Sequence, residues 1–321
     1  MSPSRRRFVG SAAALGLSSP LPGHAQAART LTLQAAGLGD AEAIGYFVAL
    51  EKGWFREEGL ELKFLPGGPE APPEAAVQSG RAEVGLATLE GVIRAITVQK
   101  APLVIIGAQF QKNPIGIVSL ANRPIRSPRD LIGKTLAVTV ADRPAVDALF
   151  ALNGVDPAKV RIVPYANDPR PLLKGEIDAA LDVTTRAPFT VKTGGGQASS
   201  FLLADFRLPP FGDVLVVKRD TLAARRADLV GFLRAGRRGW DENFRDAAAY
   251  PPKFAETWFK GAGRSIDSEL YVNGAQKSLI QHPKGVFTMS EASIKACIDA
   301  LRALDIKAER SHFDTTLLAR V

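Results

Sequence analysis

A single cysteine and three histidines are all the thiol and imidazole groups in this 321-residue sequence. One cysteine excludes an internal disulfide, and the helical context of Cys297, EASIKACIDALRAL, predicts a packed apolar side chain. The two histidines beyond the N-terminal segment, His282 and His312, do not lie in loops that follow predicted strands. The G-x-S-x-G, H-E-x-x-H and P-loop lysine motifs are absent as well. We therefore expect no catalytic site, no metal site and no cofactor.

Runs of one charge and long apolar runs are also missing. The net charge of +8 falls to +5 without the three arginines near the N-terminus, and no basic run stands elsewhere. This balance gives no reason to expect a nucleic-acid partner. No later segment has the run of about 20 apolar residues that a membrane-spanning helix needs.

The first 27 residues predict export. Three arginines, Arg5 to Arg7, precede a short and mildly apolar stretch, and Ala25-Gln26-Ala27 fits the small-x-small pattern of a cleavage site. The run from Ser4 to Val9 resembles a twin-arginine signal, with an ordinary secretory signal as the alternative. We expect cleavage after Ala27 and a periplasmic location.

The rest of the chain alternates between predicted strands and predicted helices. TLTLQAAG, LELKFLPGG and PLVIIGAQF are predicted strands with helical segments after them, and the alternation restarts at KTLAVTV. Alternation of this kind predicts parallel sheets covered by helices on both faces. The strand FGDVLVVKRD reads as a return to the first sheet, before a mostly helical C-terminus. We predict an α/β protein of two lobes, each a mostly parallel sheet covered by helices, between which the chain crosses twice.

The predicted divisions follow from the two crossings. They are a signal peptide at 1–27, a first lobe at 28–114, a second lobe at 115–212, and a return to the first lobe with C-terminal helices at 213–321. In open parallel sheets, ligands bind beyond the carboxyl ends of the strands. The cleft between the lobes is therefore the predicted binding site.

Five segments in this order resemble the thiamine-precursor-synthesis-like family of periplasmic substrate-binding proteins. They are GYFVALEKGWFREEGLELKFLPGGPE, SGRAEVGLAT, SPRDLIGKTLAVT, LLKGEIDAAL and FGDVLVVKRD, and the likeness covers roughly residues 31 to 240. The resemblance implies a type II two-lobed fold that closes on its ligand like a hinge. It also implies a monomer that captures a small-molecule solute and delivers it to an ABC permease in the inner membrane. A ligand-sensing module for a membrane receptor is the alternative that this resemblance leaves open.

Candidate ligand-binding residues of the first lobe lie where predicted strands end. Gly67 and Gly68 allow close approach to the backbone, although they could also form a simple turn. Glu90 begins a helix, where it could interact only with the helix dipole. Gln109 and Phe110 follow an apolar strand and suit a flat heterocycle, unless Phe110 packs inside the lobe. The remaining candidates in this lobe are Asp40 and Thr88.

The second lobe contributes two polar sets that each follow a strand and precede a helix. They are Thr139, Asp142 and Arg143, and then Asp182, Thr184 and Arg186. Asp142 could be only a helix N-cap, and the two arginines could instead hold a carboxylate, sulfonate or phosphate. Phe211, at the return crossing, is a candidate for stacking on the ligand or for the hinge.

The ligand that these residues predict is a flat nitrogen heterocycle or similar aromatic solute and not a bare oxyanion. Pro69 and Glu70 weaken the glycine loop as an anion site, because proline lacks an N–H group and glutamate repels anions. Asp142 and Asp182 place carboxylates on the same cleft. The resemblance points to a pyrimidine precursor of thiamine or to a flavin, with an alkanesulfonate, taurine, nitrate or another small anion as the alternative.

Overall fold

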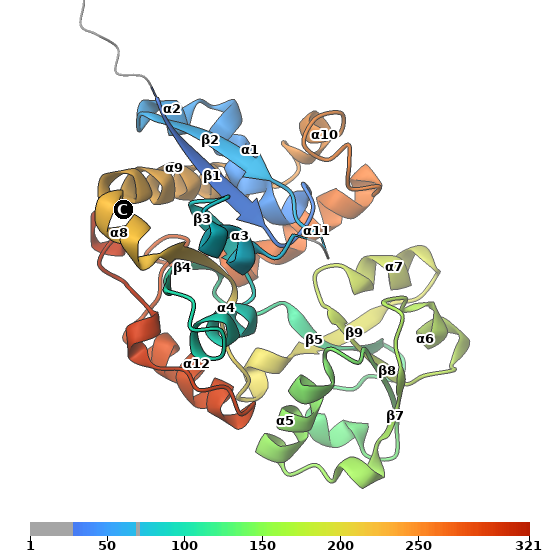
Figure 1. The fold of residues 1–321 in the computed structure, drawn as a ribbon. Coiled ribbons are helices and arrows are strands. Elements are labelled where there is room, and N and C mark those ends of the chain that lie inside the picture. The colour runs from blue at the N-terminus through green and yellow to red at the C-terminus, as the bar shows by residue number, and fades with distance from the viewer. Residues whose placement is uncertain (1–27, 69–70) are drawn as a thin grey trace, which may run out of the picture.

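The computed structural model describes residues 28–68 and 71–321. The predicted signal peptide and the argument from Pro69 and Glu70 fall outside these residues. The described chain forms two lobes, each built on a five-stranded sheet (Figure 1). The first sheet has the spatial order β2 (Leu60–Leu65), β1 (Arg29–Ala35), β3 (Val84–Ala87), β10 (Gly212–Lys218) and β4 (Leu103–Phe110). The second has the order β7 (Arg161–Pro164), β6 (Thr135–Val138), β8 (Ala179–Val183), β5 (Ile115–Leu120) and β9 (Ala198–Leu202).

Both sheets are mostly parallel, and each contains one antiparallel strand. In the first sheet this strand is β10, which pairs antiparallel with β3 and β4. In the second it is β5, which pairs antiparallel with β8 and β9. Each of these is the first strand after a crossing between the lobes, so a strand that arrives from the other lobe enters its sheet in reverse. The prediction of two α/β lobes with mostly parallel sheets is confirmed.

Helices cover both faces of each sheet. The first lobe carries α1 (Ile44–Glu51), α2 (Trp54–Glu57), α3 (Pro73–Ser79), α4 (Leu89–Thr97), α8 (Arg219–Ala224), α9 (Arg226–Arg245), α10 (Pro251–Phe254), α11 (Ile266–Ile280) and α12 (Glu291–Ala303). The second carries α5 (Arg143–Asn153), α6 (Arg170–Lys174) and α7 (Ala187–Thr193). Short 3₁₀ helices are η1 (Ala41–Ala43), η2 (Pro128–Leu131), η3 (Pro157–Lys159), η4 (Leu203–Phe206), η5 (Arg310–His312) and η6 (Leu318–Arg320).

Strand β4 shows why the central strands are apolar throughout. Val104 and Ile106 pack in the core that α1 and α9 share, whereas Leu103 and Ile105 pack in the core of α4 and α12. Because successive side chains point to opposite faces, a strand covered on both sides needs apolar residues at every position. Cys297 is buried in the second of these cores, as its helical context predicts.

The two crossings run side by side, and both contribute to the wall of the space between the lobes. One joins β4 to β5 through residues 111–114, and the other joins η4 to β10 through residues 207–211. The backbone N–H of Asn113 donates to the carbonyl of Pro210 at 2.7 Å, which ties them together. The sheets therefore assign every strand to a lobe, while the exact boundaries at 114/115 and 212/213 stay predictions.

Candidate functional site

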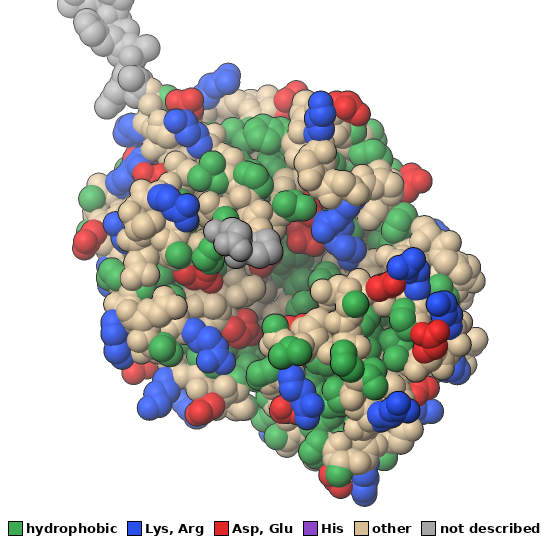
Figure 2. Space-filling model, turned by 45° about the vertical axis from the view of Figure 1, so that its right-hand side comes forward, with side chains coloured by type: hydrophobic (Ala, Val, Ile, Leu, Met, Phe, Trp, Pro, Cys, Tyr) green, Lys and Arg blue, Asp and Glu red, His purple; other side chains and the backbone are tan. Residues whose placement is uncertain are grey.

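A cavity of about 440 Å³ lies between the two lobes, where the surface is hollowed (Figure 2). Both lobes and both crossings contribute to its wall. Much of the wall is apolar and includes Leu89, Phe110, Ile115, Val183, Leu208 and Leu304. A volume in this range and a largely apolar wall are typical of sites for small organic molecules.

Carboxylates dominate the charge of this wall. Within the described residues, its charged members are Glu42, Glu90, Asp142, Asp213 and Arg94. Glu42 lies in η1 after β1, Glu90 in the first turn of α4 after β3, and Asp142 at the N-cap of α5 after β6. The carboxyl ends of parallel strands bring these side chains to one place, as the general rule for such sheets predicts.

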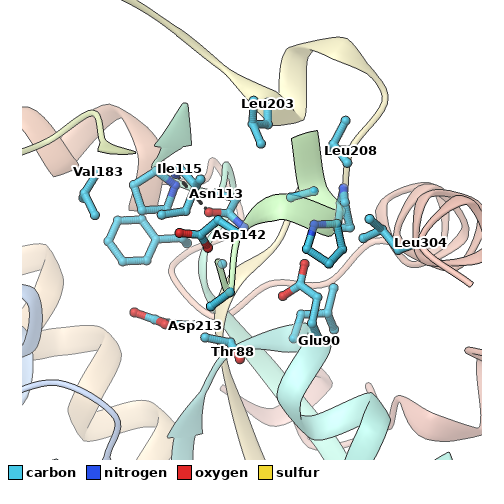
Figure 3. A pocket seen from close by; sticks show the side chains of 18 of the residues that line it. Thr88, Glu90, Asn113, Ile115, Asp142, Val183, Leu203, Leu208, Asp213 and Leu304 are labelled. Atoms are coloured by element: carbon cyan, nitrogen blue, oxygen red, sulfur yellow. Dashed lines mark hydrogen bonds between the residues drawn. The ribbon is translucent and has the colours of Figure 1, made fainter. Parts of the chain in front are cut away.

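Glu90, Asp142 and Asp213, which we call the open carboxylates, surround one space (Figure 3). Asp213 is the second residue of β10, with φ of 44°, a left-handed conformation that aspartate tolerates better than most residues. No side-chain hydrogen bond or ion pair joins Glu90 or Asp213 to another residue that the structure describes, although the N–H of Glu90 donates to its own carboxyl. Asp142 accepts a hydrogen bond of 2.6 Å from the Thr139 hydroxyl. Two of these three carboxylates therefore have no partner from another described residue.

Burial raises the pKa of both carboxyls that lack a partner. The pKa of Asp213 rises from 3.8 to about 7, first because of burial and then because Glu42, Asp40 and Glu90 are negative neighbours. Burial is also the main reason why the pKa of Glu90 is raised; its own N–H and the positive charge of Arg94 oppose the shift, and Asp142 adds to it. A raised pKa means that the surroundings of these carboxyls disfavour their charged forms.

A second acidic group, which we call the paired cluster, joins the lobes at another part of the cleft. Arg186, from the second lobe, contacts Glu42 at 3.0 Å, Asp40 at 3.3 Å and Glu269 at 3.5 Å, all in the first lobe. Arg264 also pairs with Asp40. Burial, followed by repulsion from Glu42, raises the pKa of Asp40 to about 7, while Arg186 opposes this shift. The guanidinium of Arg186 therefore pairs with carboxylates of the opposite lobe.

Buried polar groups hold η1, and so Glu42, in place. Glu269 Oε2 accepts the N–H of Ala41 at 2.7 Å, and Gln276 Nε2 donates to the Ala41 carbonyl at 2.7 Å. Gln109 Nε2 donates to the Glu42 carbonyl at 2.8 Å, and its side chain is fully buried. Gln109 therefore acts on the cavity through the backbone of Glu42.

Of the fourteen predicted site residues, Thr88, Glu90, Phe110 and Asp142 line the cavity. Thr88 is the N-cap of α4, and its Oγ1 accepts the N–H of Gly91 at 3.2 Å. Asp40 and Arg186 belong to the paired cluster, while Gln109 and Thr139 support residues of the wall.

The other predicted residues of the second lobe do not line this wall, although two of them bond to residues that do. Asp182 accepts hydrogen bonds from the Tyr165 hydroxyl and from the N–H of Val183, and burial raises its pKa. The Thr184 hydroxyl donates to the Pro114 carbonyl at 2.8 Å and so braces the first crossing. Arg143 is exposed and pairs with Asp147 at 2.8 Å.

Packing explains the positions of Gly67 and Phe211, and a positive φ explains the glycine at Gly68. A side chain at Gly67 would collide with the carbonyl oxygens of Ala35 and Ala36, and its N–H donates to Gly37 at 2.7 Å. Gly68, with φ of 155°, accepts the N–H of Ala71 at 3.0 Å. Phe211 is buried in the core with α4 and α12. None of the three is part of the cavity wall in the described structure.

Sequence reasoning missed Glu42 and Glu269 and did not list Asp213 as a ligand candidate. Glu269, Asn273 and Gln276 are fully buried on one face of α11. Their spacing of four and three residues was a signal, since it places three polar side chains on one side of a predicted helix. The sequence could not show that this side is buried.

The part of the chain that the structure describes contains no helix long and apolar enough to span a membrane. It also brings together no group of three His, Cys, Asp or Glu side chains that could hold a metal ion.

Two sheet-and-helix lobes with a cavity between them define the architecture of periplasmic binding proteins. A family model described as NMT1/THI5 like matches residues 40–249, and the chain belongs to this family. This assignment agrees with the family that the sequence motifs resemble.

Individual relatives are distant. The riboflavin-binding protein RibY of Chloroflexus aurantiacus is 24% identical over 234 residues, which cover 71% of this chain and 66% of that protein. The formylaminopyrimidine-binding protein of Halalkalibacterium halodurans is 24% identical over 202 residues, which cover 61% and 60%. The chain thus spans slightly under two thirds of the length of each. The periplasmic aliphatic sulphonate binding protein SsuA from Escherichia coli superposes with a TM-score of 0.63 and 15% identity, covering 86% of both chains. That likeness establishes the fold alone.

Proposed function

We propose that this protein is the solute-binding component of an ABC import system and captures a small, flat heterocyclic or aromatic solute between its lobes. The observation that carries the proposal is the interlobe cavity, because its wall joins apolar side chains from both lobes to hydrogen-bond acceptors. The two relatives reported above are named for the ligands riboflavin and formylaminopyrimidine, which are flat nitrogen heterocycles of this kind. A thiamine pyrimidine precursor or a flavin is the corresponding class of solute.

Closure of the cleft is the proposed mechanism. A solute that contacts both walls stabilises the closed form over the open one, by as much as its affinities for the two forms differ. A permease in the membrane then recognises the closed surface and receives the solute. We further propose a monomer, exported to the periplasm by the twin-arginine route, with binding and not catalysis as its activity.

Phe110 is the aromatic residue of the wall that the sequence already predicted as a stacking surface. It lies at the end of β4 and is almost fully buried in the first lobe, with part of its surface lining the cavity. Because only 1% of Phe110 is exposed and its ring belongs to the core of the first lobe, the support for an aromatic solute comes from the apolar wall as a whole.

The second candidate, an anion such as a sulfonate or nitrate, has support from the shared fold with SsuA. The charges of the wall oppose it. Arg143 points to Asp147 and Arg186 to three carboxylates, so neither arginine predicted to hold an anion is free to do so. Arg94 is the remaining cation among the described residues of the wall, which also holds four carboxylates. A receptor-coupled sensing module stays the alternative from another class.

A matched pair of neighbouring substitutions tests whether the cavity binds the solute. Ala141 is exposed and lines the cavity, whereas Val140 is 92% exposed and lies outside the wall. We expect Ala141→Trp to weaken binding of a pyrimidine or flavin by about tenfold or more, because the indole occupies ligand space. Val140→Trp should leave the affinity within about twofold. The measurement is isothermal titration of the mature protein against pyrimidines, flavins, taurine, alkanesulfonates and nitrate.

Binding of an oxyanion alone would contradict the proposed solute class. Equal affinities of the two tryptophan variants would instead place the site elsewhere on the molecule.

A further inference from the structure

The cleft holds an excess of negative charge that the protein does not neutralise. Glu90 and Asp213 have no side-chain partner among the described residues, and Asp142 has only the neutral Thr139 hydroxyl. Arg94 is exposed, so solvent screens its charge. The guanidinium of Arg186 is already shared by three other carboxylates.

Carboxylates withdrawn from water without a counter-charge are unfavourable, and the molecule has two ways to relieve this cost. One is to bind a proton, which agrees with the raised pKa of Asp213. The other is to bind a cation that replaces the missing counter-charge. A neutral ligand with hydrogen-bond donors relieves only part of the cost, because it leaves the net charge of the cleft unchanged.

The paired cluster shows one kind of cation that the carboxylates of this cleft bind. A guanidinium is a flat cation whose N–H groups lie in its plane. Arg186 presents such a group from one lobe to Glu42, Asp40 and Glu269 of the other, at 3.0, 3.3 and 3.5 Å. Glu42 also belongs to the cavity wall. A flat cation, the guanidinium of Arg186, is therefore already paired with one carboxylate of this wall, next to the open carboxylates.

We infer that the solute of this cleft is a flat organic cation, such as a protonated or N-alkylated aminoheterocycle, whose charge is met by Glu90, Asp142 and Asp213. Apolar side chains such as Ile115 and Leu208 contact its faces, and the carboxylates accept hydrogen bonds from its edge. The inference rests on the proposed function and narrows its solute class to one charge state. It separates this protein from a binder of neutral flavin.

Three pyridine derivatives of nearly equal size test the charge directly. 1-Methylnicotinamide carries a fixed positive charge, nicotinamide is neutral, and nicotinate is negative. Titrated into the mature protein at pH 8, the cation should bind about tenfold or more tightly than the neutral ring, with no binding of the anion. Thiamine and its isolated pyrimidine extend the comparison to larger rings.

Two substitutions identify the residues that recognise the charge. Glu90→Gln combined with Asp213→Asn should weaken binding of the cation by about tenfold or more and leave neutral ligands nearly unaffected. Asp147→Asn is the matched control, because Asp147 is an exposed carboxylate on α5 outside the cavity wall. It should change neither affinity.

The melting temperature of the ligand-free double variant tests the inference even if none of these probes binds. The double variant should melt about 2–4 °C higher than the wild type, since it removes unpaired carboxylates from the cleft. A lower melting temperature would show that the protein itself uses these carboxylates, and the inference would fail. Equal binding of cation and neutral ring would also overturn it while leaving the proposed function intact. Binding of oxyanions alone would overturn both.

Discussion

Two groups of carboxylates lie in the same cleft and differ in what surrounds them. In the paired cluster, Asp40, Glu42 and Glu269 contact Arg186, and Arg264 adds a second cation. The open carboxylates form no ion pair with any described residue, and the exposed Arg94 is the one cation among the described residues of their wall. The difference teaches that one group is tied into the structure of the cleft by cations, whereas the other is the group that we propose meets the solute.

The paired cluster is also a bridge between the lobes. Arg186 lies just before α7 of the second lobe, and Glu269 lies in α11 of the first. Phe189 and Tyr271, from the same two helices, approach with ring centroids 5.5 Å apart. The open carboxylates line the cavity instead, together with Asn113, Pro114, Leu208 and Pro209 of the two crossings.

The largest effect should come from removing the cation of the bridge. Arg186→Met leaves the buried Glu269 without its ion pair and Asp40 with Arg264 alone, so the free energy of unfolding should fall by about 3 kcal/mol. Urea unfolding of the ligand-free protein measures it. Arg170→Met removes an exposed pair with Asp168 and should cost at most about 0.5 kcal/mol.

Small-angle scattering adds a second measurement for Arg186→Met. Loss of the bridge should increase the radius of gyration of the ligand-free protein, because the lobes lose a contact that joins them. If unfolding and radius both match the Arg170→Met control, the paired cluster has no structural role, and the comparison between the two groups fails.

A smaller effect should come from the glycine loop that supports the segment before Asp40. Gly67→Ala forces a methyl group against the Ala35 and Ala36 carbonyls, which should cost about 1–3 kcal/mol of unfolding free energy. Gly274→Ala is the control, since that position in α11 is exposed with open space around it. It should stabilise the protein by about 0.5–1 kcal/mol. A harmless Gly67→Ala would show that close packing is not why glycine stands there.

Much of the fold could be predicted from the sequence because its causes are local. A strand such as β4, apolar at every position, signals a sheet covered on both faces. Ser127 and Pro128 signal the start of η2, and the structure has the capping box there with Asp130. The return of β10 to the first sheet could be predicted because this strand follows the second set of alternating elements.

The partners of the site residues could not be predicted, because they depend on distant contacts. Arg186 and Asp40 are 146 positions apart in the chain, and no periodicity connects them. The position of Asp182 after a strand suggested that its side chain faces the cavity, but its partner is Tyr165. Phe211, predicted as a stacking or hinge residue at the return crossing, lies in a core. Whether each predicted residue contacts the solute stays a prediction.

The next prediction uses pH to measure the cost of an open carboxylate. The pKa of Asp213 is about 7 in the folded protein and 3.8 without perturbation. Between these values the folded state holds a proton that the unfolded state has lost. The free energy of unfolding therefore falls as pH rises from about 4 to 7 and levels off above. Asp213→Asn removes this slope, so the variant should gain about 1–2 kcal/mol over the wild type at pH 8.

The slope of unfolding free energy against pH is compared between the wild type and Asp213→Asn, and the difference is the contribution of Asp213. The charged and titratable groups that act on it or share its wall are Asp40, Glu42, Tyr46, Glu90, Arg94 and Asp142. Asp40 has a similarly raised pKa, so part of the slope should remain in the variant. Urea unfolding at intervals between pH 5 and 8 provides both curves. Parallel curves would mean that Asp213 stays ionised and has a counter-charge in the folded protein.

The smallest effect should come from the arginine next to an open carboxylate. Arg143 follows Asp142 in the chain, but its side chain is exposed and pairs with Asp147 at 2.8 Å, one turn along α5. An exposed pair of this spacing contributes about 0.3–0.5 kcal/mol. We expect Arg143→Ala to change the unfolding free energy by no more than that and the solute affinity by less than about twofold. Asp142→Asn, one residue earlier, should weaken binding of a cationic solute by about tenfold. Titration calorimetry on both variants compares them. A large loss of affinity in Arg143→Ala, with Asp142→Asn unaffected or improved, would mean that the solute is an anion and that the open carboxylates are not its partners.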